Sequence, residues 1–342
     1  MVSITDVAKK AGCSATLVSR VVNNQHGVSE KSRQKIQAAI DELGYTPNGL
    51  ARSLVLKSTN TIGVVVDTLC DAYFFDLIHA IEEEVGKQGY DVLFCSAGNS
   101  TEKKNSYINF FMQERVDGIL IYGSALDDKK LITKLARSHF PFALIENDMG
   151  SLNVNNILLN NQYGSEVAVD YLFQCGCRNI IHVAGDENRQ AARRRQKGYV
   201  NTMKKHGVQD VRILQSGWSE EEGYTTLKEF LSTCRKEELP DAFFFSSDQT
   251  AFGGMRALLE AGIRIPEDVM LVGFDDDQPR NHNFQYLPLT TVRQPLGDMG
   301  KAAVDILITD IKEKKEVKEK KMFYPNLVIR QTTRNNNQIE QK

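Results

Sequence analysis

The sequence lacks the features of a membrane-bound, exported or metal-binding protein. No hydrophobic run approaches the length that crosses a bilayer, and no apolar export signal stands at the N-terminus. The six cysteines are scattered, and Cys175-Gly176-Cys177 is too closely spaced for the usual zinc pair. We therefore expect a cytoplasmic protein that holds no metal and no cofactor.

Catalytic signatures are missing as well. The chain has no Gly-x-Gly-x-x-Gly after a strand, no phosphate loop ending in Gly-Lys-Ser/Thr, no Gly-x-Ser-x-Gly elbow and no His-Glu-x-x-His. Its six histidines have no ligand spacing, and His182 inside an apolar strand is typical of a core residue. We expect that the protein is not an enzyme.

From Thr61 onward, apolar strands alternate with amphipathic helices. This alternation is typical of parallel sheets covered by helices, and the number of strands suits an α/β body of two doubly wound lobes. Ligands of such sheets bind beyond the carboxyl ends of the strands. The predicted strands are 62–66, 90–94, 118–122, 142–145, 179–183, 242–245 and 269–274.

The first 46 residues have the pattern of a helix-turn-helix unit. Val7 and Ala11 recur at helical spacing, Gly12 allows a tight turn, and Ser14 can cap a second helix. A third helix begins near Ser29, and the three helices share one small core. The unit therefore predicts a head that places its second helix in the major groove of DNA.

The outward face of the second helix carries Ala15, Thr16, Ser19 and Arg20. Arg20 is the candidate for reading a guanine edge, although a structural cap with a solvated arginine has the same helical pattern. Charge favours DNA binding, because residues 1–60 hold eight Lys and Arg against four acids, whereas the whole chain has a net charge of −2.

Behind the head stands Tyr45-Thr46-Pro47-Asn48-Gly49-Leu50-Ala51-Arg52-Ser53-Leu54. With it the chain resembles the LacI/GalR family of bacterial transcription regulators, up to about Arg334. The resemblance implies a hinge helix and linker at 47–59 that becomes ordered when two subunits meet over the minor groove, with Leu54 as a wedge between bases. The residues expected to contact DNA are Thr5, Ser14, Ala15, Thr16, Ser19, Arg20, Asn23, Ser29, Tyr45, Asn48, Arg52 and Leu54.

The resemblance also implies that the body, 60–334, closes on a small molecule and that the chain crosses between its lobes three times. We expect the first lobe at about 60–160 plus 290–320, the second at about 161–289 plus 321–334, and a polar tail at 335–342. Because the tail lacks leucine heptads, a homodimer is favoured over a tetramer. The head distinguishes the chain from a periplasmic binding protein.

Three residues match the ligand-binding positions of the family. Asp275 follows a strand where an anchoring aspartate sits, Arg195 precedes Gly198-Tyr199 as the ligand-binding arginine does, and Trp218 matches a stacking aromatic. Ordinary strand-end polar groups or a core aromatic would give the same pattern. The expected ligand-binding residues are Asp67, Tyr73, Phe74, Tyr122, Glu146, Arg189, Arg195, Trp218, Asp248 and Asp275.

The class of effector is less determined. Tyr73, Phe74 and Arg189 resemble the purine-repressor branch, whereas Asn147 and Ala191 depart from it. The balance favours a sugar or sugar phosphate over a purine. We thus expect a nucleoid-associated repressor of a carbohydrate uptake or catabolism operon, binding a palindromic operator as a dimer. The alternatives are a purine-responsive regulator and a catabolite-control regulator that also answers to a phosphocarrier protein.

Overall fold

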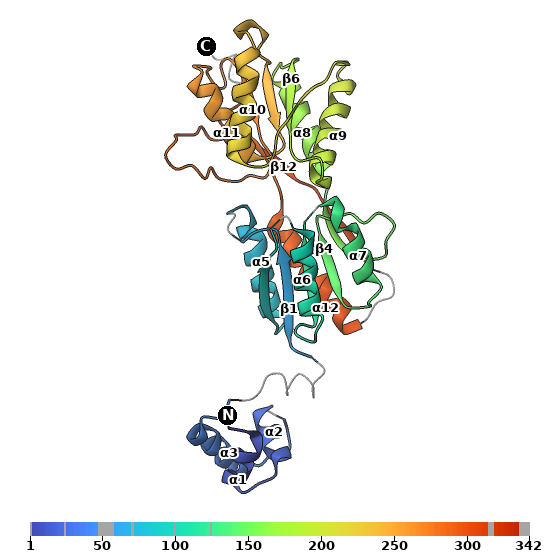
Figure 1. Cartoon of the computed structure of the whole chain (residues 1–342), viewed down its shortest axis with the longest axis vertical. Coiled ribbons are helices and arrows are strands. Elements are labelled where there is room, and N and C mark those ends of the chain that lie inside the picture. Colours follow the sequence, from blue (N-terminus) through green and yellow to red (C-terminus); the bar gives the residue numbers. More distant parts are fainter. Residues whose placement is uncertain are drawn as a thin grey trace. The chain divides into compact units, whose positions relative to one another are not determined.

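The chain divides into two compact units, residues 1–59 and 60–342 (Figure 1). The structure, a computed structural model, describes residues 2–23, 25–46, 58–69, 72–98, 100–123, 125–313 and 318–334. Within these ranges no helix is both long and apolar enough to span a membrane. The polar tail and residues 47–57 of the predicted hinge lie outside the described part.

The first unit contains the three predicted helices, α1 Ile4–Ala11, α2 Ala15–Val22 and α3 Glu30–Leu43. Ser14 and Ser29 cap α2 and α3, since their hydroxyls accept from backbone N–H groups at 3.2 Å. Gly12 ends α1 in the left-handed conformation, which turns the chain into α2. The shared core consists of Val7, Ala8, Ala11, Val18, Val21, Ile36 and Ala39.

The first lobe of the second unit is a parallel sheet of order β11-β5-β4-β3-β1-β2. Helices α5 and α12 lie against each other and α12 packs on β3, β4 and β5, whereas α6 contacts β1. Its elements are β1 Thr61–Val66, η1 Ala72–Phe74, α5 Phe75–Lys87, β2 Asp91–Ser96, α6 Thr101–Phe111, β3 Gly118–Tyr122, η2 Leu126–Asp128, α7 Lys129–Ala136, β4 Phe142–Ile145, β5 Asn155–Leu159, α12 Leu296–Glu313 and β11 Lys320–Phe323.

The second lobe is a parallel sheet of order β7-β6-β8-β9, and the short antiparallel pair β10-β12 continues it at the junction with the first lobe. Helices α8 and α9 pack together, as do α10 and α11. Its elements are α8 Asn161–Gln174, β6 Ile180–Ala184, α9 Gln190–Lys205, β7 Arg212–Gln215, α10 Glu220–Thr233, η3 Lys236–Glu238, β8 Ala242–Phe245, α11 Asp248–Glu260, β9 Met270–Val272, β10 Thr291–Arg293 and β12 Asn326–Val328.

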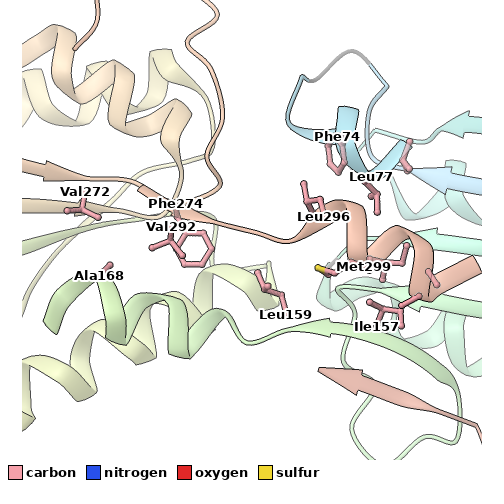
Figure 2. Close-up of a cluster of buried hydrophobic side chains, with 14 of the residues drawn as sticks. Phe74, Leu77, Ile157, Leu159, Ala168, Val272, Phe274, Val292, Leu296 and Met299 are labelled. Atoms are coloured by element: carbon pink, nitrogen blue, oxygen red, sulfur yellow. The ribbon is translucent and has the colours of Figure 1, made fainter. Parts of the chain in front are cut away.

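Within the described residues the chain passes between the lobes after β5, β10 and β11. A buried apolar cluster continues along these crossings, from Phe274 and Val292 in the second lobe to Leu296 and Met299 in the first (Figure 2). The lobe boundaries differ from the predicted ones by a few residues. Strand β10 pairs with the second lobe, and β11 belongs to the first because it pairs with β5.

The packing of α8 against α9 in the second lobe can be tested at a point where the two helices lie close together. A Cβ atom at Gly198 on α9 would lie 2.4 Å from the carbonyl oxygen of Gln162 on α8. We expect Gly198→Ala to lower the free energy of unfolding by about 1–3 kcal/mol, because the two helices must separate. Chemical denaturation measures the change. The control Gly86→Ala, with no atom within 4 Å of its new Cβ, should leave stability unchanged or raise it.

Candidate functional site

The head presents α2 as its candidate DNA face. Thr16 and Arg20 are exposed, whereas Ala15 and Ser19 are half-buried. Asn23 donates from Nδ2 to the carbonyl oxygen of Ser19 at 2.9 Å, which fixes the end of the helix. Arg20 is thus an exposed side chain on a capped helix whose polar side could enter a major groove.

The other DNA candidates fall into four groups. Thr5 is exposed on α1, and the hydroxyls of Ser14 and Ser29 are used as helix caps. Tyr45 packs against the head core. Three further candidates, Asn48, Arg52 and Leu54, lie outside the described residues.

In the second unit a cavity of about 320 Å³ opens between the two lobes. Nine of the ten predicted ligand-binding residues line it, with Asp248 as the exception. Strand ends of both sheets converge here, as parallel sheets predict. The described lining residues are Asp67, Thr68, Tyr73, Phe74, Gly98, Tyr122, Glu146, Arg189, Ala191, Arg195, Trp218, Ser247, Gln249, Asp275, Asp277 and Arg280.

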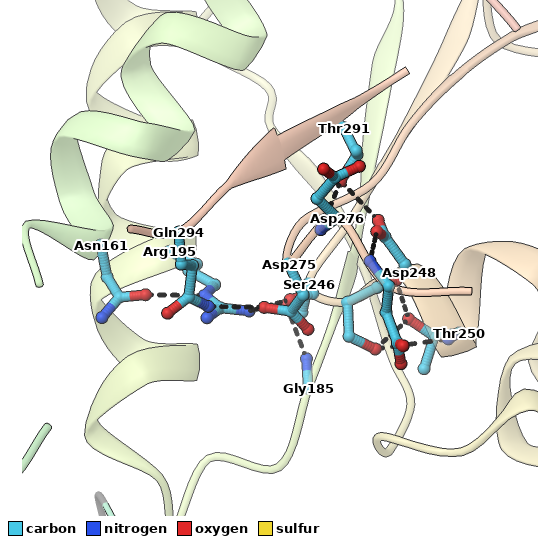
Figure 3. A network of polar contacts seen from close by, with 12 residues as sticks. Asn161, Gly185, Arg195, Ser246, Asp248, Thr250, Asp275, Asp276, Thr291 and Gln294 are labelled. Atoms are coloured by element: carbon cyan, nitrogen blue, oxygen red, sulfur yellow. Dashed lines mark hydrogen bonds and ion pairs between the residues drawn. The ribbon is translucent and has the colours of Figure 1, made fainter. Parts of the chain in front are cut away.

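Arg195 and Asp275 form the centre of a buried polar network (Figure 3). Arg195, only 3% exposed, contacts Asp275 Oδ1 through Nη1 at 3.0 Å and donates from Nε to Asn161 Oδ1 at 2.8 Å. Gln294 donates to the same Asp275 oxygen at 2.7 Å. Arg195 and Gln294 thus both contact Oδ1 of Asp275. Its other carboxylate oxygen, Oδ2, is the one that a ligand could use.

The environment of Asp275 is unusual in two respects. Burial raises the pKa of its carboxyl to about 7, although the Arg195 charge opposes the shift. Its φ of 119° lies in a region that side-chain-bearing residues rarely adopt. Strained, perturbed acids cluster at functional sites, so these features support a binding role for Asp275.

Aromatic side chains form the apolar walls. In the first lobe, the Phe74 ring meets Tyr73 and Tyr122 edge-on, with centroids 4.9 and 4.8 Å apart. In the second lobe, Trp218 lies at the start of α10, held by its backbone N–H bond to Glu222 at 3.1 Å. Trp218 Nε1 is buried and has no hydrogen-bond partner among the described residues.

Glu146 and Arg189 line the cavity but are already engaged. The Glu146 oxygens accept from the Leu159 backbone N–H at 2.8 Å and from Asn161 Nδ2 at 3.1 Å, and burial raises its pKa. Arg189 Nη1 lies 2.6 Å from Asp67 Oδ2, which makes an ion pair between the lobes. The predicted purine-type role of Arg189 must therefore compete with this pair.

The structure does not bring Asp248 into the cavity lining. It begins α11, is completely buried, and accepts from Thr291 Oγ1 at 2.6 Å and from the Asp277 backbone N–H at 2.8 Å. Its side chain thus holds the segment that carries Asp275 (Figure 3). Asp248 was predicted to bind ligand because it follows a strand. A residue at a strand end can point behind the edge of the sheet as well as into the cleft.

Sequence reasoning missed several polar residues of the site. Asn161 and Gln294 follow β5 and β10, strands that the sequence analysis did not identify. Gln249, whose Oε1 is buried without a partner among the described residues, lies one position after Asp248. Recognising those two strands would have flagged Asn161 and Gln294 as strand-end groups.

Comparisons with known proteins agree with this architecture. Residues 3–48 match bacterial regulatory proteins of the lacI family, and residues 169–333 match a periplasmic binding protein-like domain. The HTH-type transcriptional repressor PurR of Haemophilus influenzae (strain PittEE) is 32% identical over 340 residues, 98% of this chain and 99% of the relative. PurR of Klebsiella pneumoniae (strain 342) is also 32% identical, over 97% of both chains.

Among solved structures, the Lac repressor dimer bound to operator and the anti-inducer ONPF matches with a TM-score of 0.84 and 29% identity, covering 97% of this chain and 99% of that one. These likenesses confirm the resemblance and the predicted fold class, and they agree with the expectation that the chain is not an enzyme. The chain belongs to the lacI family of bacterial regulatory proteins, as a DNA-binding transcriptional repressor with a periplasmic-binding-protein-like effector domain.

Proposed function

We propose that two copies of this chain bind a near-palindromic operator through their heads, and that a small effector in the interlobe cavity changes operator affinity. The observation that carries the proposal is the pairing, in one chain, of a capped helix-turn-helix with a cavity built from both lobes. An effector shifts DNA binding only if it binds one arrangement of the lobes more tightly than the other. Such a protein would act in the cytoplasm, at the nucleoid.

Assembly as a homodimer has support from the surface of the first lobe. Leu69 and Phe75 are 41% and 68% exposed, and they line one surface hollow with Ile78 and Phe94. Exposed apolar groups gathered at one place are typical of protein contacts. A Lac repressor structure similar to this chain is a dimer bound to operator DNA.

For the effector we propose a purine-like base as the first candidate. The full-length similarity to PurR supports it better than the carbohydrate favoured by the sequence alone. The aromatic wall of Tyr73, Phe74 and Tyr122 suits a flat ring. A sugar is the second candidate, because the carboxylate of Asp275 in the lining can accept hydroxyl donors.

Arg20 gives the test of the DNA-binding face. Arg20→Ala should weaken binding to the preferred operator by about 1–3 kcal/mol and relax the choice of base at one position, because one bidentate contact is lost. Fluorescence anisotropy on operator variants measures both effects. Lys31→Ala, an equal loss of charge on α3, should weaken binding to all sequences by the same factor. Unchanged operator affinity in Arg20→Ala would remove this residue from the interface.

Calorimetric titration of nucleobases and sugars tests the effector. Binding of a nucleobase together with a change in operator affinity is expected. Binding of sugars alone would select the second candidate. If ligands of both classes bind without any effect on operator affinity, the allosteric proposal fails.

A further inference from the structure

We propose that Asp67 determines which effectors the cavity admits: by occupying Arg189, it makes the cavity accept uncharged molecules and reject their phosphorylated forms. The proposal rests on the proposed function only in taking this cavity as the effector site. Under this proposal the cavity accepts uncharged nucleobases and sugars alike. It rejects their phosphorylated forms, the nucleotides and sugar phosphates.

Asp67 stands directly after β1, and its side chain is 12% exposed at the cavity wall. Its Oδ2 lies 2.6 Å from Nη1 of Arg189, which precedes α9 in the other lobe. The backbone supports this pairing, because the Leu126 N–H donates to the carbonyl oxygen of Asn188 at 3.0 Å across the lobes. The guanidinium that could meet an anionic ligand is thus already matched by a carboxylate.

A second cation fixes Asp67 from behind. Lys104 on α6 is 1% exposed, and its Nζ lies 3.1 Å from Asp67 Oδ1 and 2.7 Å from Asp128 Oδ2. Asp128 also accepts from Thr101 Oγ1 at 2.8 Å. The two acids Asp67 and Asp128 therefore balance the charges of two bases, Lys104 and Arg189. If Asp67 turned away, Lys104 would keep only one of its two carboxylate partners.

The Asp67–Lys104 contact lies close to the backbone that follows β3. A Cβ atom at Gly123, where φ is +136°, would lie 2.8 Å from Lys104 Nζ and 3.3 Å from Asp67 Oδ1. The end of β3 thus approaches the ion pair closely. A side chain at position 123 would therefore have to displace part of the Asp67–Lys104 contact.

The two other arginines of the described lining each lie near a carboxylate, one in a buried contact and one in an exposed, longer contact. Arg195 contacts Asp275 at 3.0 Å, and Arg280, whose side chain is 54% exposed, lies 3.9 Å from Asp277. Glu146 adds a further acidic side chain to the lining. A phosphate would bring its negative charge among these carboxylates, whereas hydroxyl and N–H donors find acceptors.

Inorganic phosphate is the first probe. Wild type should show no calorimetric binding of phosphate at millimolar concentrations. Asp67→Asn keeps the shape of the side chain but removes its charge, so that Arg189 and Lys104 are left with an excess of positive charge. We expect this variant to bind phosphate at least about tenfold more tightly than wild type.

Asp148→Asn is the matched control. It removes a carboxylate from another ion pair between the lobes, Asp148 Oδ2 to Arg194 Nη2 at 2.5 Å, and neither residue is in the described cavity lining. This variant should gain no phosphate binding. Equal phosphate binding by the two folded variants would overturn the role of Asp67.

A second measurement needs no variant and holds even if Asp67→Asn fails to fold. Wild type is titrated with matched pairs, hexoses against hexose phosphates and nucleobases against nucleotides. Tighter binding of an uncharged member supports the proposal, and tighter binding of a phosphorylated member overturns it. Operator selection by the head is measured separately, so loss of DNA binding would count against the proposed function and not against this inference.

Discussion

Arg195→Met is expected to lower the free energy of unfolding by about 3–5 kcal/mol, because it leaves a buried acid without its cation. The guanidinium contacts Asp275, Asn161 and the carbonyl oxygen of Ser246, and it lies 3.7 Å from the centre of the Phe274 ring. All of these contacts are lost together, and methionine can replace only the stacking on the ring.

The adjacent Arg194 provides the control. It also pairs with a carboxylate, that of Asp148, but its side chain is 34% exposed, so the pair is screened by water. Arg194→Met should cost less than about 1 kcal/mol. Urea denaturation of both variants gives the comparison, and equal losses would show that Arg195 is not the structural centre of the cleft.

Asp275→Ala is expected to abolish the response to effector while leaving operator affinity intact. The head that reads DNA forms a separate compact unit, whereas Asp275 lines the cavity with Oδ2 available to a ligand. Anisotropy titrations of the operator, with and without a bound effector, measure both properties. Loss of operator binding by the folded variant would assign Asp275 a different role.

The pH dependence of effector affinity gives a second readout of Asp275. Burial raises the pKa of its carboxyl to about 7, so the protonated form dominates below that pH and the carboxylate above it. An effector whose donors bind the carboxylate should therefore bind more tightly at pH 8 than at pH 6. Asp275→Asn should remove this dependence, and a pH profile unchanged by Asp275→Asn would contradict the assignment.

Local signals in the sequence explain what could be predicted. The caps Ser14 and Ser29 and the apolar spacing of the head depend on neighbouring residues only. His182 is likewise a buried core residue, with Nδ1 2.9 Å from the carbonyl oxygen of Phe244 and a pKa that burial lowers to about 4. Predictions that rest on such short-range patterns agree with the structure.

Features that depend on distant contacts were not predictable. Strand β10 spans only Thr291–Arg293, too short for an alternating pattern, yet it positions Gln294 beside Asp275. Lys104 has the sequence signature of an exposed helix residue, and only the approach of Asp67 and Asp128 explains its burial. The charge balance of the cavity arises from tertiary structure and cannot be deduced from spacing.

Selection of binding sites from a pool of random duplex DNA by the purified full-length protein tests the central claim most directly. We predict enrichment of one near-palindromic sequence, in which two half-sites each contact one head. Failure to enrich any sequence above random duplex, by a protein shown to be folded, would contradict the account.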